Sequence, residues 1–121
     1  MGKKSRTKGA GGELEFRTIV NKKFGVKYER TPLSGGLDIK GDIRRAYGSR
    51  ASIADEFHWE IKRVEKINIH ECLTQSINDC RPGKIPVVAH RRNCDYWKIT
   101  IQADDFLNLI LELEELRGKP E

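Results

Sequence analysis

The segment that most constrains the fold runs from Phe57 to Lys62, where apolar and polar side chains alternate without interruption. Such a period of two is typical of a β-strand whose two faces meet different surroundings. We therefore expect a half-buried strand. Its core side is expected to carry Phe57, Trp59 and Ile61, and its polar side His58, Glu60 and Lys62.

The remaining patterns predict helices and strands in mixed order. Helices are expected over 13–24, 68–79 and 103–116, strands over 26–30, 39–45, 85–89 and 96–101, a loop over 31–36 and an exposed connection over 46–56. The order α-β-β-β-α-β-β-α indicates an α/β (α+β) fold in which a mixed sheet is flanked by helices. A chain of 121 residues can build one core, so we expect a single domain.

The first helix has an acidic residue beside its apolar stripe of Phe16, Ile19, Val20 and Phe24. At about 100° per residue, Glu13 lies within about 45° of the centre of this stripe. A carboxylate at the rim of a buried face needs a partner. That partner could be a metal ion or a basic neighbour such as Arg17, or the carboxylate could be solvated in the first helical turn.

Glu15 lies more than about 100° from the centre of the stripe, and we expect it to face solvent. Upstream, Gly9, Gly11 and Gly12 separate a basic segment from this helix. Residues 1–12 are therefore expected to form a flexible basic arm, followed by a domain over 13–121.

Three further residues carry chemistry: Asp42 after Gly41, and Glu60 with Lys62 eighteen residues later. Hydrolysis of a phosphodiester needs a deprotonated water and stabilisation of growing negative charge, both of which Mg²⁺ can supply. Mg²⁺ prefers carboxylate oxygens as ligands. On a strand, Glu60 and Lys62 share a face roughly 6–7 Å apart, so the ammonium lies beside such a metal. Taken singly, an Asp after Gly at a strand edge is usually a turn residue, and Glu-x-Lys on an exposed strand face is usually a solvated pair.

The net charge of +5 is unevenly distributed along the chain. Residues 1–50 hold 13 basic and 5 acidic residues, a balance of +8, whereas residues 104–121 hold 2 and 6, a balance of −4. A basic half favours a polyanion partner, although a solubilising surface is an equal alternative. The residues expected to contact such a polyanion are Lys3, Lys4, Arg6, Lys8, Arg30, Lys40, Arg44 and Arg45.

The chain has no apolar stretch of about 18 residues that could span a bilayer, and no signal peptide is apparent, so a cytoplasmic location is expected. Cys72, Cys80 and Cys94 have no recognised metal-ligand spacing and cannot form a closed disulfide framework. We expect free, buried thiols. A zinc site shared with the histidines is the less favoured alternative.

Taken in order, several motifs resemble a known family. They are Lys8-Gly9-Ala10 before Glu13, Arg30 at the end of a strand, Gly41-Asp42, Glu60-Ile61-Lys62, the run from Gly83 to Ala89, and Tyr96-Trp97. Over nearly the whole chain, this order resembles the archaeal-type Holliday junction resolvases, a branch of the PD-(D/E)XK nuclease superfamily that is also found in phages.

The resemblance implies a restriction-endonuclease-like fold and a homodimeric endonuclease dependent on Mg²⁺, for which Mn²⁺ can substitute. Such an enzyme resolves four-way DNA junctions by paired nicks that leave 5′-phosphate and 3′-hydroxyl ends. By position, Glu13, Asp42 and Glu60 would hold the metal, and Lys62 would be the catalytic lysine.

The resemblance also suggests secondary candidates. Ser34 matches a position where the family often has a hydroxyl near the metal or phosphate, and Gln75 is a minor candidate on the following helix. Asp38 competes with Asp42 for the metal role. Asp42 is preferred because it follows Gly41 at the turn position of the superfamily, although Gly41 replaces the usual proline.

The last helix is more apolar than one core face requires. Leu107 and Leu111 lie roughly 100° around the helix from its main stripe. The surplus predicts a two-fold dimer interface, which would suit a junction with two scissile phosphates. A helix wedged between other elements explains the pattern equally well.

Three functions remain open at this point. The leading hypothesis is the junction-resolving endonuclease. The alternatives are a related nuclease acting on other branched or duplex DNA, and a basic DNA-binding module in which the acidic residues are only structural.

Overall fold

The computed structural model describes residues 3–31 and 42–119. The elements are α1 (Lys3–Phe24), β1 (Tyr28–Arg30), β2 (Ile43–Arg45), the 3₁₀ turn η1 (Ile53–Glu56), β3 (Phe57–Arg63), α2 (Ile69–Asp79), β4 (Ile85–Arg91), β5 (Lys98–Ile101) and α3 (Ala103–Arg117). Their order confirms the predicted mixed α+β fold.

The strands form two sheets that meet at Asp42. β3 runs parallel to β4 with Phe57 opposite Ile85, and β5 is antiparallel to β4. β1 and β2 form an antiparallel pair. The Asp42 amide donates a 2.7 Å hydrogen bond to the Trp59 carbonyl, which ties the start of β2 to the open edge of β3.

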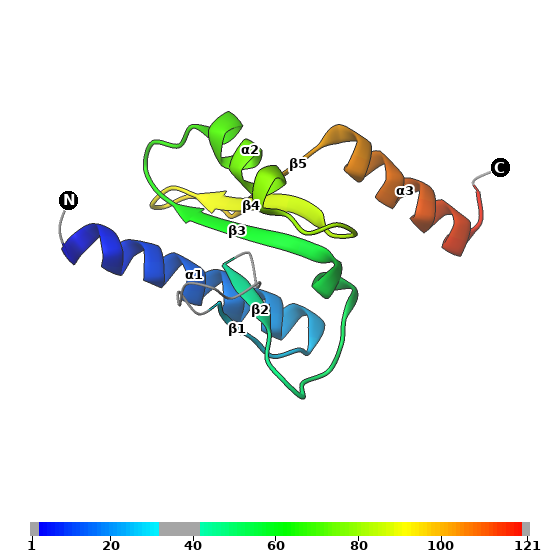
Figure 1. Ribbon diagram of the computed structural model, residues 1–121, viewed down its shortest axis with the longest axis horizontal. Helices are drawn as coiled ribbons and strands as arrows, with labels where there is room; N and C mark the ends of the chain where they lie inside the picture. The colour runs from blue at the N-terminus through cyan, green and yellow to red at the C-terminus, as the bar shows by residue number, and fades with distance from the viewer. Residues whose placement is uncertain (1–2, 32–41, 120–121) are drawn as a thin grey trace.

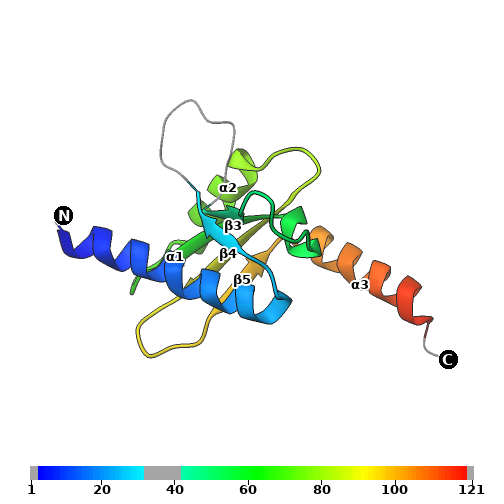
Figure 2. The same cartoon turned by 90° about the horizontal axis from the view of Figure 1, so that it is seen from below.

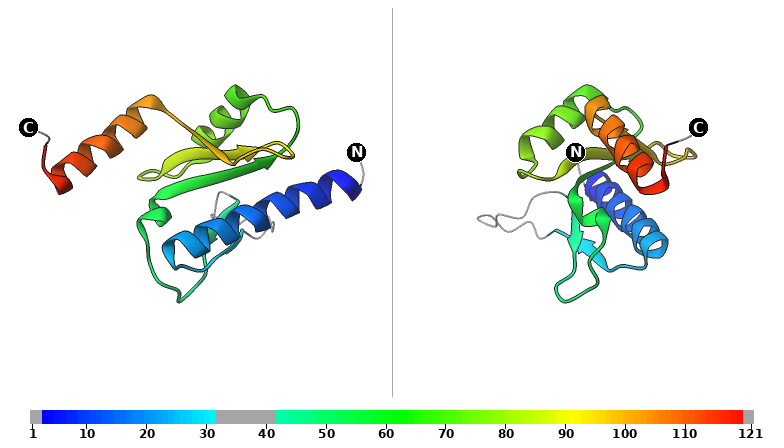
Figure 3. Two further views of the ribbon diagram at one scale, coloured as in Figure 1. Left: turned by 180° about the vertical axis from the view of Figure 1, so that it is seen from behind. Right: turned by 90° about the vertical axis from the view of Figure 1, so that its right-hand side faces the viewer.

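Helices cover both faces of the larger sheet (Figure 1). α1 packs on β3 from one side, and α2 packs on β4 and β3 from the other. Viewed from behind and from the side, the same three layers are seen (Figure 3). β4 is therefore covered on both faces, which explains its fully buried Val88 and Ala89.

The core lies between α1 and the sheet. The Phe16 ring lies 5.5 Å from that of Trp59 and 5.0 Å from that of Trp97. Val20 and Val26 complete this side of the core. The expected stripe on the first helix is wrong at two positions, because Ile19 and Phe24 are exposed while Phe16 and Val20 are buried.

α1 begins at Lys3, ten residues before the predicted start at Glu13, so most of the expected arm over 1–12 is helical. The glycines do not interrupt the helix. Gly12 instead lies against Arg63, where an added Cβ would come within 2.8 Å of the arginine Cβ. This glycine permits close approach of α1 to β3.

β3 differs from the predicted half-buried strand, because its polar side is also covered. His58 and Glu60 are buried, and only Lys62 on that side is partly exposed. Residues 46–56 are likewise more structured than expected. They contain η1, which has a capping box on Ser52 and buries Ala54 against the core.

The cysteines are free, as predicted, but Cys94 is exposed and the other two are only partly buried. No helix in the described part of the chain is long and apolar enough to cross a membrane.

α3 projects beyond the edge of the sheet and carries no buried residue (Figure 2). Its predicted bounds are confirmed to within one residue. Large apolar side chains line its exposed surface: Phe106, Leu107, Ile110, Leu111, Leu113 and Leu116. The alternative of a helix wedged between sheet and neighbouring helix is therefore wrong for a single copy of the chain.

Candidate active site

Asp42 is held at the junction of the two sheets by three backbone links. Its carbonyl accepts from the Thr31 amide at 2.9 Å, and its own amide donates to Trp59. Its side-chain Oδ2 accepts a 2.6 Å hydrogen bond from the Ile61 amide. These bonds fix the carboxylate at the open edge of β3, which is the strand that carries Glu60 and Lys62.

The ionisation of Asp42 shows which charges lie near it. Burial and the negative charges of Glu60 and Glu13 together raise the pKa of Asp42 to about 7, although the Ile61 amide and Lys62 act in the opposite direction. The residues predicted from the sequence thus meet electrostatically around one carboxylate. A buried group with like-charged neighbours is typical of a functional site.

Glu60 is buried on β3, with its side chain only 9% exposed. Its Oε1 lies 3.0 Å from His58 Nε2. His58 is itself almost fully enclosed, so the imidazole fixes the orientation of Glu60. The sequence pattern placed His58 on the same face as Glu60, two residues away, and this spacing was the available signal for their contact.

Glu13 reaches toward the site from α1. Its side chain is 16% exposed and forms an ion pair with Arg30, not with Arg17. The contact is close, but Glu13 Oε2 accepts no well-aligned hydrogen bond from any described residue. A buried oxygen in this state retains the capacity to bind a cation.

Glu15 is not the solvent-facing residue that the helical wheel predicted. Its carboxylate accepts from Arg91 Nε at 2.7 Å, Arg91 Nη2 at 3.0 Å and Trp97 Nε1 at 2.6 Å. Arg63 lies 3.6 Å away. The prediction failed because the sheet extends beyond the apolar stripe and supplies cationic partners from β3 and β4.

The other predicted residues are spread more widely. Arg44 pairs with Glu29 at 3.0 Å, and Arg45 pairs with Asp55 at 3.3 Å. Gln75 lies on the exposed face of α2, while its neighbour Ser76 is buried and donates to the Val87 carbonyl. The role of Gln75 as a minor site residue stays a prediction.

Several predictions lie outside what the structure describes. Ser34, Asp38 and Lys40 belong to residues 32–41, which fall outside the described ranges. Lys3, Lys4, Arg6 and Lys8 lie in α1, and only their backbone is described. The choice between Asp38 and Asp42 thus remains a prediction, although Asp42 has the expected position beside Glu60.

A divalent cation needs several oxygen ligands that converge on one point. Within 3–31 and 42–119, no three His, Cys, Asp or Glu side chains converge closely enough to hold a metal by themselves. Three features nevertheless suit one: the Glu13 Oε2 atom, which has an ion-pair contact but no hydrogen bond, the mutual repulsion around Asp42, and an all-oxygen donor set. The residues therefore fit a hard divalent ion.

An aspartate at a strand edge, followed by Glu-x-Lys on the next strand of a mixed α+β sheet, is the arrangement of the PD-(D/E)XK nucleases. Enzymes of this class cleave DNA and generally use divalent metal ions. The model of the family described as "Phage putative PDDEXK endonuclease" matches residues 4–117. The chain belongs to this phage endonuclease family and has its restriction-endonuclease-like fold.

No curated protein and no solved structure gives a significant match to the chain.

Proposed function

We propose that this endonuclease resolves four-way DNA junctions by paired nicks that leave 5′-phosphate and 3′-hydroxyl ends. The observation that carries the catalytic part of the proposal is the fixed position of the Asp42 carboxylate, which accepts a 2.6 Å hydrogen bond from the Ile61 amide, between Glu60 and Lys62 on β3. The preference for branched DNA rests on the sequence resemblance and on the unpartnered surface of α3.

Asp42, Glu60 and Glu13 are proposed to hold Mg²⁺, or Mn²⁺ in its place. The bound ion would supply a nucleophilic hydroxide and stabilise negative charge on the phosphate. His58 keeps Glu60 oriented, and the Ile61 amide does the same for Asp42. Lys62 offers an ammonium on the same strand face as Glu60, which suits it to the charge of the scissile phosphate.

Arg30 has two roles in this account. In the structure it neutralises Glu13. With a cation at the site, Glu13 would turn to the metal, and the Arg30 guanidinium would be available to the DNA backbone. The further phosphate contacts are assigned to Lys3, Lys4, Arg6, Lys8, Lys40, Arg44 and Arg45, with Ser34 near the phosphate or metal.

A homodimer is proposed to act on the junction, because two symmetric nicks require two active sites. α3 supplies the apolar surface for such pairing, since Leu107 is 59% and Phe106 is 51% exposed. The site of action would be the cytoplasm of the phage-infected cell.

A substrate panel tests the proposal. A labelled four-way junction, a flap and a duplex are incubated with the protein in Mg²⁺ or in EDTA, and product ends are identified by ligation. We expect paired nicks in the junction with Mg²⁺ only, and ligatable products.

Equal cutting of all three DNAs would overturn the junction preference and leave a general nuclease. Cleavage of none of them in Mg²⁺ or Mn²⁺, together with tight DNA binding, would overturn the enzymatic proposal in favour of a binding module.

A further inference from the structure

A cavity of about 320 Å³ lies between β2, the start of β3 and the segment that precedes β4. Four cationic side chains and one carboxylate are among its lining residues, together with three aromatic rings. This combination of positive charge and ring faces differs from the acidic cluster. The lining residues used in the argument below are Arg45, Arg81, Lys84, Tyr28, Phe57 and Trp59.

The cations of the cavity are not equally available to a ligand. Arg44 is paired with Glu29, and Arg45 with Asp55. Arg81 and Lys84 lie in the segment between α2 and β4 and are exposed. Neither forms an ion pair with a residue of the described ranges. Their charges can therefore bind an anion without first breaking an internal contact.

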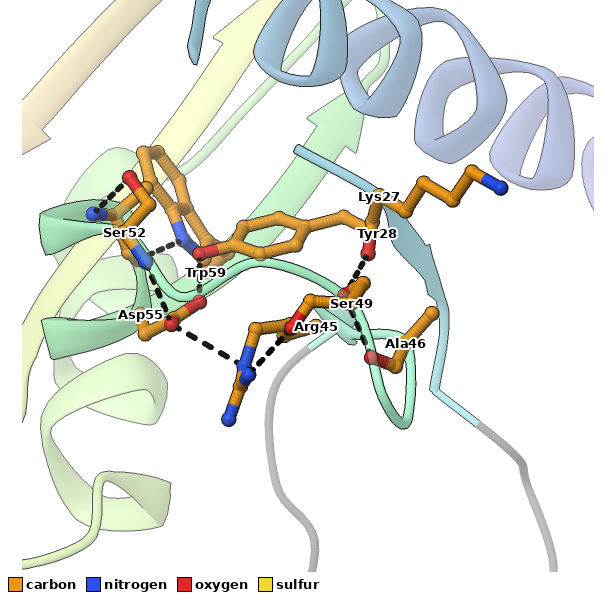
Figure 4. Close-up of polar contacts among 9 residues, drawn as sticks. Lys27, Tyr28, Arg45, Ala46, Ser49, Ser52, Asp55 and Trp59 are labelled. Atoms are coloured by element: carbon orange, nitrogen blue, oxygen red, sulfur yellow. Dashed lines mark hydrogen bonds and ion pairs between the residues drawn. The ribbon is translucent and has the colours of Figure 1, made fainter. Parts of the chain in front are cut away.

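The aromatic wall is fixed by hydrogen bonds that use its polar atoms (Figure 4). The Trp59 indole donates to the Ala54 carbonyl at 3.0 Å, and the Tyr28 hydroxyl donates to Asp55. Asp55 also accepts from the Ser52 amide. With these groups satisfied, the wall presents apolar ring surface to the cavity.

Two residues that line the cavity adjoin the candidate active site. His58 lines it, and the same imidazole contacts Glu60. Ile43, which also lines it, follows Asp42 directly. A ligand in the cavity would therefore lie beside the acids that are proposed to hold the metal.

We infer that this cavity binds one unpaired nucleotide of the DNA strand next to the phosphate at the acidic cluster. Arg81 and Lys84 contact phosphates of the strand, and the base stacks against the ring of Phe57 or Trp59. The base must be unpaired because a ring can stack on it only when it has left its own stack. The inference rests on the proposed function, since it assigns the cavity to the same DNA.

The test measures DNA affinity in EDTA, where no cleavage occurs. Arg81→Ala combined with Lys84→Ala is compared with the wild type on a duplex that carries unpaired nucleotides. We expect affinity to fall by about 10-fold or more at low salt. The slope of log K against log salt should shrink by about 1.4 to 1.8, because two phosphate contacts are lost.

A matched control removes two charges elsewhere. Lys22→Ala with Lys23→Ala, at the exposed end of α1, has the same charge change and should leave both quantities close to wild type. Equal losses in the two double variants would overturn the inference, because they would show only a general charge effect.

A second measurement locates the base. 5-Bromodeoxyuridine is placed at each unpaired position in turn, and photo-crosslinks are mapped by mass spectrometry. We expect one position to crosslink within the peptide that contains Phe57 and Trp59. Crosslinks confined to other peptides would overturn the assignment.

The two proposals fail separately. Wild-type affinity in the Arg81/Lys84 variant, with metal-dependent cleavage retained, removes the nucleotide cavity and leaves the nuclease. Loss of affinity in that variant, with no cleavage by the wild type, keeps the cavity and removes the enzymatic function.

Discussion

At the scale of single residues, one of two carboxylates on α1 lies in the environment that the helical wheel assigned to it, and the other does not. Glu13 was expected at the rim of the core and lies there, paired with Arg30. Glu15 was expected in solvent and instead binds Arg91, Trp97 and Arg63. One helix defines its own apolar stripe, but it does not reveal which side chains the sheet will bring to the stripe's border.

The network of Glu15 leads to a prediction about stability. Glu15→Gln should lower the free energy of unfolding by about 1–3 kcal/mol, because charge-assisted hydrogen bonds to Arg91 are lost. Urea denaturation followed by tryptophan fluorescence measures this change.

Glu29→Gln is the control for that experiment, because it removes an ion pair at the surface and should cost at most about 1 kcal/mol. The hydrogen bonds from Arg91 lower the pKa of Glu15, so its contribution is present above the ordinary carboxyl pKa and is lost in acid. An unchanged denaturation midpoint for Glu15→Gln near pH 7 would contradict the account.

Ionisation of Asp42 has the opposite effect on stability to ionisation of Glu15. Its pKa of about 7 in the folded protein exceeds the ordinary value of 3.8, so the folded state binds this proton more tightly than the unfolded state. Ionised Asp42 therefore reduces stability as pH rises from about 4 to about 7. Asp42→Asn should be more stable than the wild type at pH 8, by an amount on the order of a few kcal/mol, and equally stable near pH 4.

Thermal melting across this pH range measures the difference. Adding Mg²⁺ at pH 8 should raise the melting temperature of the wild type and not that of Asp42→Asn. A variant less stable than the wild type at pH 8 without metal would contradict the repulsion that we assign to the site.

At the scale of elements, the regular strands and helices follow from sequence periodicity, and their ends do not. β4 is buried on both faces, as its apolar run predicted. Residues 3–12 were assigned to a separate arm because glycine is a poor helix former, yet α1 includes them. The close approach of Gly12 to Arg63 is a tertiary contact, and tertiary contacts override local propensity.

Gly11 and Gly12 provide a matched pair of substitutions. Gly11→Ala places its Cβ 3.9 Å from the nearest Arg63 atom, an ordinary contact. It should therefore stabilise the protein by up to about 1 kcal/mol through helix propensity. Gly12→Ala would bring its Cβ within 2.8 Å of Arg63 Cβ and should destabilise the protein. Chemical denaturation of both variants checks the prediction, and equal stabilisation by both would refute the role of Gly12.

α3 gives the second prediction at this scale. Because its large apolar side chains are exposed, the protein should be a dimer at micromolar concentration by light scattering. Leu107→Glu with Leu111→Glu should give a folded monomer, since α3 has no buried residue that the fold requires.

Asn108→Glu is the control on the same helix and should remain dimeric. A monomeric wild type would contradict the role assigned to α3.

At the scale of the whole molecule, the charge distribution and the topology both agree with the nuclease class. The basic excess falls in the first fifty residues, the part of the sequence that contains Glu13 and Asp42, whereas α3 is acidic and apolar. The order of the motifs was sufficient to predict the nuclease class. It could not reveal the cavity beside His58, because Tyr28, Phe57 and Arg81 come together only through the packing of three separate segments.

The most direct test of the central claim is the rate of DNA nicking in Mg²⁺ by Asp42→Asn and Glu60→Gln. Loss of a proposed metal ligand should lower the rate by about 10³-fold, since several kcal/mol of transition-state stabilisation disappear. DNA binding in EDTA should persist, and Glu56→Gln, an exposed carboxylate outside the cluster, should retain the wild-type rate. Nicking at the wild-type rate by both Asp42→Asn and Glu60→Gln would show that the catalytic site lies elsewhere.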